Sequence, residues 1–243
     1  MRNFGLIGYP LGHSFSKKYF TEKFKDLGLS DHKYGLFELE TIDLFPELWK
    51  DPDLVGINVT VPHKQAVRQY LDALDPSAEK VGAVNVIKRT GNRLTGYNSD
   101  YFGFRTSLEN FMPKNSVRKA LILGTGGSSK AVKAVLTDLN IQFVFVSRKS
   151  GEGMISYDQM TPEIIKEHQL IVNTTPLGMH PKVDNCPAIP YEALGSVHLL
   201  FDLVYNPETT KFMQMGLDQG ARVKNGLEML HLQADKSWEI WNS

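Results

Sequence analysis

The chain of 243 residues is long enough for one large domain or two modest ones, and its 42% hydrophobic and 22% charged residues are ordinary for a globular protein. Its 27 basic and 27 acidic residues cancel and form no basic stripe, so the sequence lacks the electrostatic footprint of a nucleic-acid-binding protein. A single cysteine, Cys186, excludes an internal disulfide, and no apolar run reaches the ~20 residues of a membrane span.

The first hundred residues alternate between the patterns of strands and helices, which is typical of an α/β protein. Residues 4–7 form a predicted strand where a secreted protein would carry its signal peptide, so we expect a cytoplasmic protein without a membrane partner. The elements expected next are a helix that ends at Gly28, strands at 34–39 and 54–61, a helical pattern at 64–74, a hairpin of strands 82–88 and 94–97, and a helix at 101–111.

The stretch NVTVPHK at 58–64 leads from a strand to a lysine. Apolar residues at every second position from Val55 predict the strand, and Pro62 ends it because proline cannot donate to a sheet ladder. Lys64 then opens the segment that follows. A lysine just beyond a polar strand end is a common way to hold a small ligand, although an ordinary surface lysine gives the same pattern.

From residue 119 the sequence has the pattern of a second unit with buried parallel strands. We expect strands at 119–123, 142–147, 170–173 and 199–203, helices at 128–139, 212–220 and 227–242, and a loop at 178–190.

A glycine loop, GTGGSS at 124–129, separates the first strand of this unit from its first helix. Gly124 permits a tight turn and Gly126 lets the backbone approach a pyrophosphate, while Thr125, Gly127 and Ser128 would offer the free N–H groups of the helix N-terminus. Ser129 occupies the third glycine position of the dinucleotide fingerprint. The loop therefore predicts a dinucleotide site, and a glycine-rich turn without a ligand is the alternative.

The end of the second strand indicates which dinucleotide binds. NAD-binding folds usually carry an acidic residue there, whereas the 2′-phosphate of NADP requires a cation. This chain has Arg148 and Lys149 at that point, which favours NADP(H), with Arg148 as the main contact because guanidinium pairs well with phosphate. Glu152 is the one nearby acidic residue that weakens this preference.

Six motifs together resemble the shikimate dehydrogenase family over nearly the whole chain. They are HSFS at 13–16, NVTVPHK at 58–64, GAVN at 82–85, NSDYFG at 98–103, the glycine loop, and GLEMLHLQ at 226–233. The resemblance implies NADPH-dependent reduction of 3-dehydroshikimate to shikimate in aromatic amino-acid biosynthesis. It also implies an α/β substrate domain, 1–102 with the helix 227–243, and a Rossmann-type doubly wound parallel sheet domain, 103–226, with a cleft between them.

The resemblance assigns roles to particular residues. Lys64 and Asp100 match the catalytic pair, in which the lysine exchanges a proton with the substrate and the aspartate orients it. The matching substrate-binding positions are Ser14 and Ser16 for the carboxylate, and Thr60, Asn85, Asp100, Tyr205 and Gln233 for the ring. The matching cofactor positions are Leu203 and Gly226, beside the glycine loop and Arg148 and Lys149.

Most of these residues also have a structural interpretation. Asn58 and Asn85 could be satisfied strand-end residues, and Ser16 or Asp100 could cap the helix that follows it. Gln233 lies at the edge of an apolar stripe, where its amide needs a polar partner of some kind. His13, His63 and His180 do not have the spacing of metal ligands, so we expect no metal.

The sequence also departs from the family pattern. The motif after the second strand reads Ser147-Arg148-Lys149 where the family usually has Asn-Arg-Thr, and His63 stands where phenylalanine is commoner. We expect almost no helix after that strand and none after the helix that carries Gln233. A quinate/shikimate dehydrogenase that uses NAD, or a catalytically silent dinucleotide or shikimate sensor, are the alternative functions, and a monomer or a homodimer is expected.

Overall fold

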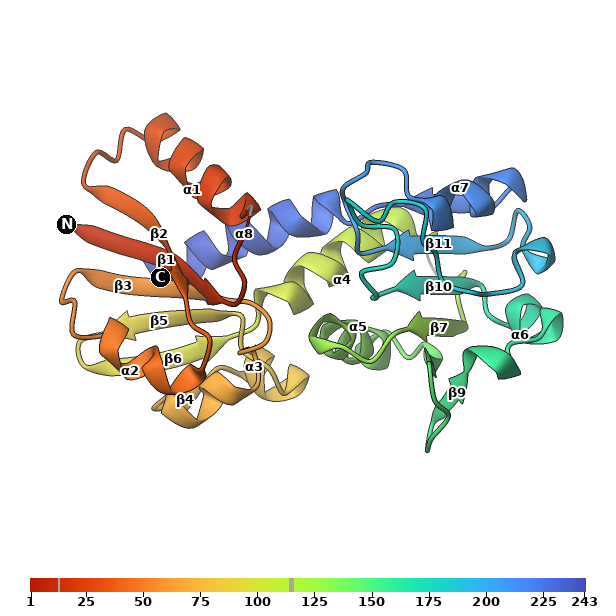
Figure 1. Ribbon diagram of the computed structural model, residues 1–243, viewed down its shortest axis with the longest axis horizontal. Helices are drawn as coiled ribbons and strands as arrows, with labels where there is room; N and C mark the ends of the chain where they lie inside the picture. The colour runs from red at the N-terminus through yellow and green to blue at the C-terminus, as the bar shows by residue number, and fades with distance from the viewer. Residues whose placement is uncertain (13, 114–115) are drawn as a thin grey trace. The chain divides into compact units, whose positions relative to one another are not determined.

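The computed structural model describes residues 1–12, 14–113 and 116–243, so His13 lies outside the described residues. Contacts divide the chain into two compact units (Figure 1): Met1–Phe102 with Gln233–Ser243, and Gly103–Leu232. Each unit is built on a six-stranded sheet. Among the described residues, no helix combines the length and the apolar character that crossing a bilayer requires.

The sheet of the first unit is mixed, with the strand order β2-β1-β3-β5-β6-β4. β1 pairs in parallel with β2 and β3, whereas β5 runs antiparallel to β3 and β6. The predicted hairpin is present, and Gly91 at φ 60° begins its two-residue turn. The strands are β1 Arg2–Gly8, β2 His32–Glu38, β3 Leu54–Val59, β4 Ala73–Leu74, β5 Val86–Thr90 and β6 Arg93–Tyr97.

Helices cover both faces of this sheet. The helical segments are α1 Phe15–Asp26, a 3₁₀ helix at Ile42–Leu44, α2 Phe45–Leu48, a 3₁₀ helix at Ala66–Tyr70, α3 Pro76–Val81, the start of α4 Ser99–Phe111, and α8 Leu227–Asn242 from Gln233 onward. Aromatic side chains from α1 and α8 pack on one face, around Phe4, Phe20 and Trp241. The opposite face buries a separate cluster around Ile57 and Phe45.

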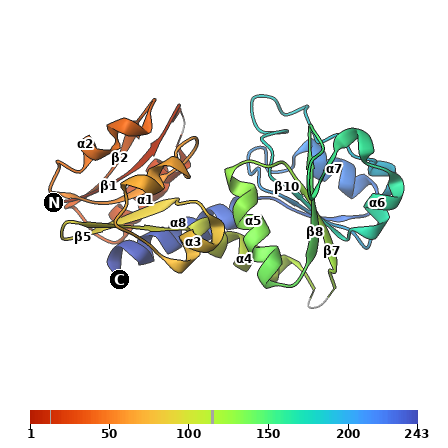
Figure 2. The same cartoon turned by 90° about the horizontal axis from the view of Figure 1, so that it is seen from below.

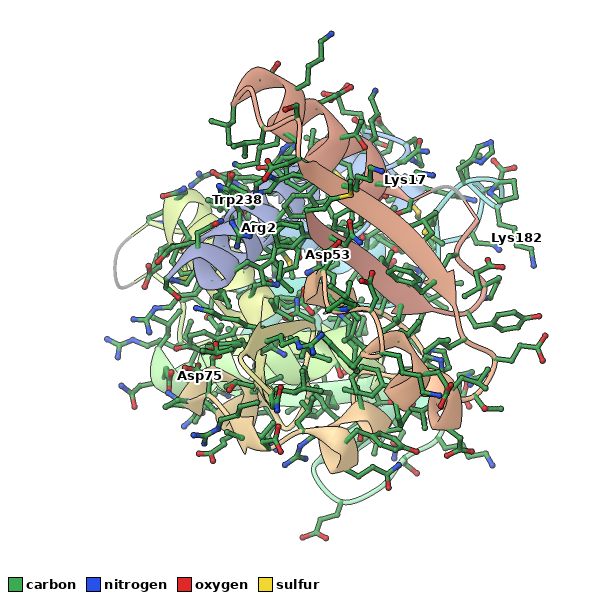
Figure 3. The ribbon with its side chains drawn as sticks, turned by 90° about the vertical axis from the view of Figure 1, so that its left-hand side faces the viewer. Arg2, Lys17, Asp53, Asp75, Lys182 and Trp238 are labelled. Carbon is green, nitrogen blue, oxygen red and sulfur yellow. The ribbon has the colours of Figure 1, made fainter. Side chains whose placement is uncertain are left out.

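Trp241 fixes α8 to the sheet through a close approach to a glycine. Its indole N–H donates to the carbonyl of Ile87 at 3.0 Å. A Cβ added to Gly56 would lie 2.4 Å from the same indole nitrogen, so only glycine leaves room for the ring. Arg2 reinforces the helix end by donating to the Trp241 carbonyl at 3.1 Å, and Figure 3 shows Arg2 and Trp238 on this face.

The helical pattern predicted at 64–74 was wrong in type. Only Ala66–Tyr70 is helical, as a 3₁₀ segment, and the chain then enters the short edge strand β4. Asp72 causes the change, because its backbone N–H donates to the Leu94 carbonyl and its carboxylate accepts from the Leu94 N–H. The sequence prediction also missed α3, although Asp75 as N-cap, Pro76 at the first position and Gly82 at φ 70° are all readable signals.

The second unit has the predicted Rossmann-type architecture. Its strands are all parallel in the order β12-β11-β10-β7-β8-β9, which is the doubly wound arrangement with its order reversed between β7 and β10. The strands are β7 Lys119–Leu123, β8 Gln142–Ser147, β9 Met154–Ser156, β10 Leu170–Asn173, β11 Leu199–Asp202 and β12 Arg222–Lys224.

Besides the remainder of α4 and the start of α8, this unit has the helices α5 Gly127–Asp138, α6 Pro162–Glu167 and α7 Lys211–Asp218, with 3₁₀ helices at Tyr157–Gln159 and Tyr191–Ala193. Helices α5 and α6 lie on opposite sides of the sheet (Figure 2). Between β8 and α6 the chain forms only β9 and one 3₁₀ helix, as the short sequence there predicted. A buried cluster around Leu121, Ile171 and Phe212 supports the sheet, whose carboxyl-terminal edge carries the glycine loop.

Candidate active site

Lys64 and Asp100, predicted as the catalytic pair, form an ion pair inside the first unit. The Lys64 Nζ atom lies 2.6 Å from Asp100 Oδ2, and the two side chains are 14% and 13% exposed. At this distance and burial the contact is a charge-assisted hydrogen bond that is shielded from most solvent. An ammonium group has three N–H donors. The contact with Asp100 takes one of them and orients the Lys64 side chain, and the others can donate to a ligand.

Lys64 lies in a turn after β3 rather than on a helix. The turn is closed by the His63 N–H, which donates to the Thr60 carbonyl at 3.0 Å. The Lys64 carbonyl accepts from the Val84 N–H at 2.8 Å, which ties the turn to the GAVN segment. His63 is buried and hydrogen-bonds through Nε2 to the Leu39 carbonyl at 2.6 Å, so this departure from the family pattern fills a packing position next to the lysine.

Asp100 stands in the first turn of α4, and a neighbour caps the helix in its place. The Asn98 side-chain oxygen accepts from the Tyr101 N–H at 3.0 Å, and its amide donates to the Ala83 carbonyl at 2.9 Å. Capping is thus supplied by Asn98, and the Asp100 carboxylate is left for Lys64. Asp100 is therefore not the cap of this helix, which was the alternative interpretation of its position in the sequence.

Ser14 is the N-cap of α1, a role that the sequence left open for Ser16. Its hydroxyl oxygen accepts from the Lys17 N–H at 3.3 Å, which leaves the hydroxyl proton able to donate to another group. Ser16 follows in the first turn, near enough to Tyr34 to oppose the rise that burial causes in the pKa of that hydroxyl. Two short hydroxyls at a helix N-terminus suit an anion, because the helix dipole is positive there.

Thr60 lies just after β3 with its methyl group turned toward the backbone. A Cβ added to Gly8 would meet this methyl at 2.4 Å, so the side chain packs closely on β1. Within the described part of the chain, the Thr60 hydroxyl makes no hydrogen bond. It is therefore available as a donor or acceptor four residues before Lys64.

Asn85 and Gln233 meet through buried hydroxyl groups. The Asn85 side chain accepts from the Ser99 N–H at 2.7 Å and donates to the Ser99 hydroxyl at 3.0 Å. Ser99 in turn donates to Gln233 Oε1 at 3.4 Å. These contacts place two predicted substrate residues on the two sides of one serine. Asn98, Ser99 and Ser237 were missed as site residues; Asn98 had a readable N-cap signal, while the two serines had none.

The glycine loop of the second unit contains two glycines with different requirements. Gly124 has φ 103° and an added Cβ would lie 2.9 Å from Thr174 and Thr175, so the fold itself demands glycine. Gly126 has φ −74°, which any residue adopts, and nothing lies within 4 Å of an added Cβ. Because no protein atom needs a glycine at 126, the open space there fits the close approach of a ligand such as a pyrophosphate.

Helix α5 begins at this loop without a side-chain cap. The N–H groups of Thr125 to Ser128 donate to no acceptor among the described residues, so they form an anion-binding helix start. Ser129, at the third glycine position, is buried and its hydroxyl donates to the Gly126 carbonyl at 2.7 Å. The dinucleotide fingerprint usually has glycine at this position, where it allows the helix and the strand to pack closely. Here the serine hydroxyl instead holds the loop by its hydrogen bond to Gly126.

Arg148 and Lys149 follow β8 and are both exposed. Neither has an ion pair or hydrogen bond to any other described residue. The Gly124 N–H donates to the Val146 carbonyl at 2.8 Å, so the glycine loop and the end of β8 are directly joined. Two unpaired cations beside an uncapped helix start are what a phosphorylated ribose requires.

Leu203 and Gly226 lie together beyond β11. An added Cβ at Gly226 would sit 2.2 Å from the Leu203 carbonyl oxygen, and the Gly226 N–H donates to the Val204 carbonyl at 3.1 Å. Tyr205, the remaining predicted substrate residue, follows Leu203 in this unit, and partial burial raises the pKa of its hydroxyl. Its grouping with the substrate residues of the first unit stays a prediction.

A buried carboxyl group organises this edge of the second sheet. Asp202, at the end of β11, accepts from the Asn173 amide at 2.9 Å, the Val204 N–H at 3.0 Å and the Thr210 hydroxyl at 2.6 Å. Burial raises the pKa of Asp202 to about 6. It thereby holds the loops that follow β10 and β11, the first of which contacts Gly124.

The described residues contain no group of three or more His, Cys, Asp or Glu side chains that could hold a metal ion. The first unit contains a lysine–carboxylate pair surrounded by hydroxyl and amide groups, and the second contains an open nucleotide-type loop.

Comparison with known proteins identifies the family. The model of the shikimate dehydrogenase substrate binding domain matches residues 6–87. A shikimate dehydrogenase (NADP(+)) of Clostridium beijerinckii is 41% identical, over 99% of this chain and 92% of its own length. The solved shikimate dehydrogenase of Aquifex aeolicus is 30% identical with a TM-score of 0.88, covering 100% of this chain and 92% of that one.

The shikimate 5-dehydrogenase of Thermus thermophilus, solved with NADP(H) and shikimate, is 28% identical with a TM-score of 0.86 and covers 99% of this chain and 93% of that one. The similarity extends through both units, and the identity to the Clostridium protein holds over nearly the full length of both chains. This chain belongs to the shikimate dehydrogenase family.

Proposed function

We propose that this protein catalyses the NADPH-dependent reduction of 3-dehydroshikimate to shikimate, with Lys64 and Asp100 as its proton-transfer pair. The observation that carries the assignment of the pair is the 2.6 Å contact between Lys64 Nζ and Asp100 Oδ2 in a mostly buried position. Asp100 is released from helix capping by Asn98, so its carboxylate serves the lysine alone among the described residues.

Reduction of a ketone to an alcohol needs a hydride and a proton. The bound dinucleotide supplies the hydride. Lys64, as ammonium, gives the proton to the oxygen that becomes the hydroxyl group, and in the oxidation of shikimate it takes that proton back. Asp100 keeps the amine oriented and balances its charge. A positioned acid of this kind typically accelerates proton transfer by roughly 10²–10⁴-fold.

Hydroxyl and amide groups bind the substrate in this proposal. Ser14 and Ser16 donate to its carboxylate at the N-terminus of α1, where the helix dipole adds to the attraction. Thr60, whose hydroxyl has no protein partner among the described residues, reads a ring hydroxyl together with Asn85 and Gln233. Tyr205 completes the set from the loop after β11. Neutral donors hold the anion without changing the charge of the Lys64–Asp100 pair.

The second unit holds NADP(H). Its pyrophosphate is bound by the uncapped start of α5 at Thr125 to Ser128, in the space that Gly126 leaves open. Arg148, supported by Lys149, pairs with the 2′-phosphate. Leu203 and Gly226 line the nicotinamide side.

The deciding experiment follows the absorbance of the reduced nicotinamide with shikimate and either NADP⁺ or NAD⁺, and repeats both with quinate. Turnover of shikimate with NADP⁺ alone is the expected result. Turnover with quinate or NAD⁺ would assign the chain to the quinate/shikimate dehydrogenases. Binding of dinucleotide without any turnover would identify a sensor and refute the proposal.

A further inference from the structure

A continuous chain of buried polar side chains runs through the first unit, behind the predicted substrate residues. Tyr34, the neighbour of Ser16, donates its hydroxyl proton to Asn58 Oδ1 at 2.8 Å. The Asn58 amide donates to the Ser237 hydroxyl at 3.0 Å, and Ser237 lies 3.2 Å from the hydroxyl of Ser99. Ser99 is the residue that holds both Asn85 and Gln233.

The middle of this chain has almost no access to solvent. Asn58 is 6% exposed, Tyr34 is 7% exposed, and Ser99 and Ser237 are 0% exposed. The ring of Phe20 stacks on Tyr34 with centroids 4.8 Å apart, so the surroundings are apolar. In such surroundings an unpaired donor or acceptor is costly, and each member is therefore held in the orientation that satisfies its neighbours.

The hydrogen-bond directions at Ser237 and Ser99 determine how Gln233 is oriented at the end of the chain. The Ser237 hydroxyl donates to the Gln233 backbone carbonyl at 2.8 Å, one turn earlier in α8. Ser99 accepts from the Asn85 amide, so its own proton points toward Gln233 Oε1 or toward Ser237. In the first arrangement the Ser99 hydroxyl donates to Gln233 Oε1 at 3.4 Å, so the Gln233 amide turns its oxygen inward and is oriented from inside the protein.

We infer that Tyr34, Asn58, Ser99 and Ser237 are positioning residues that hold Asn85 and Gln233, together with the neighbouring Ser16, as one preorganised substrate-binding surface. The inference rests on the proposed function. Ser16 beside Tyr34 and Gln233 at the other end are half-buried, and both are predicted to contact the substrate. Burial raises the pKa of Tyr34, so its hydroxyl keeps the proton that it donates to Asn58.

Tyr34→Phe and Ser237→Ala test this inference, because each removes one hydroxyl that the substrate does not contact. We expect the KM for shikimate to rise about 3- to 10-fold in each variant, with the KM for NADP⁺ within about twofold of wild type. The double variant should lose less than the product of the two single losses, because both substitutions break the same chain.

Tyr191→Phe is the matched control. Tyr191 is a buried tyrosine of the second unit whose hydroxyl donates to the Pro187 carbonyl at 2.8 Å. Thermal unfolding measures the structural cost of all the variants. We expect Tyr191→Phe to lower the unfolding midpoint about as much as Tyr34→Phe while leaving the KM for shikimate unchanged.

The outcomes separate this inference from the proposed function. If wild type turns over shikimate but Tyr34→Phe and Ser237→Ala lose only thermal stability, the chain is purely structural and the inference is wrong. If wild type neither turns over nor binds shikimate by calorimetry, the proposed function fails, and the inference fails with it.

Discussion

The predicted substrate side of the first unit and the predicted nucleotide side of the second are organised in opposite ways. In the first unit, Asn85, Gln233 and Asp100 already have protein partners, some of them fully buried. In the second, Arg148 and the N–H groups at the start of α5 have no partner among the described residues. The first side is held mainly by internal hydrogen bonds, with the Thr60 hydroxyl as an exception, and the second presents unused donors.

The difference matches the two kinds of recognition. A small polyhydroxylated ring offers few contacts, so each binding group must be held in place before the ligand arrives. A dinucleotide brings strong anionic charge, and uncommitted donors and cations gain most from it because they give up no existing partner. Substitutions should therefore act on catalysis and orientation in the first unit, and on affinity and charge recognition in the second.

Lys64→Ala is the most severe test of the first side. We expect kcat for shikimate oxidation to fall by roughly 10²–10⁴-fold, with the KM for shikimate within a few-fold, because the amine acts mainly in the transition state. Steady-state kinetics measure both constants. Lys25→Ala, at an exposed lysine of α1, is the control and should match wild type. A large rise in KM with kcat preserved would make Lys64 a binding residue.

Arg148→Ala tests the second side. Loss of a charge-assisted hydrogen bond costs about 1.5–3 kcal/mol, so the KM for NADP⁺ should rise by about 10- to 100-fold while that for NAD⁺ barely changes. Arg118→Ala is the matched control, because Arg118 is exposed just before β7, at the opposite edge of the sheet from Gly124. Equal losses for the two cofactors would mean that Arg148 does not read the 2′-phosphate.

Two glycine substitutions compare the units directly. Gly126→Ala should leave the unfolding midpoint nearly unchanged and should weaken the binding of NADP⁺ by about tenfold or more, because the new methyl group occupies only the space for the ligand. Gly56→Ala should instead lower the free energy of unfolding by about 1–3 kcal/mol, because the methyl collides with Trp241. Calorimetric titration and urea unfolding measure the two quantities, and a stability loss in Gly126→Ala would contradict the assignment.

The last expected effect is a pH dependence of stability that arises from Asp202. Its pKa of about 6 in the folded protein lies above the ~3.9 of an unfolded aspartate, so folding favours the protonated form. The contribution of Asp202 to the free energy of unfolding should then be greatest near pH 4. It should fall as pH rises, by up to about 3 kcal/mol at pH 7. Asp202→Asn should flatten this dependence in urea unfolding between these pH values.

The control for this measurement is Asp158→Asn, at an exposed aspartate of the same unit. It should keep the wild-type dependence of the unfolding free energy on pH. An identical slope in wild type and Asp202→Asn would show that Asp202 has an ordinary pKa.

Sequence patterns predicted the second unit better than the first. Its strands are continuous apolar runs, and the glycine loop between β7 and α5 has one dominant physical interpretation. The first unit depends on contacts between distant residues: Lys64 and Asp100 are 36 positions apart and were paired only through the family resemblance. Short elements such as β4 and β12 carry too few residues for a periodic signal.

The buried polar chain could not be predicted from the sequence, for a different reason. Ser99 and Ser237 are separated by 138 positions, and each looks like a tolerated small residue in its helix. Their importance depends on which acceptors surround them, which only the fold determines. His63 illustrates the same point, because its position in the core was set by the Leu39 carbonyl.

The placement of Trp241, which packs against Gly56 in the first unit, has a spectroscopic consequence. All three tryptophans of the chain, Trp49, Trp238 and Trp241, belong to the first unit, and the second contains none. Intrinsic indole fluorescence therefore reports on the first unit alone. Comparison of that emission with circular dichroism during denaturation would reveal whether the two units lose their structure together or one after the other.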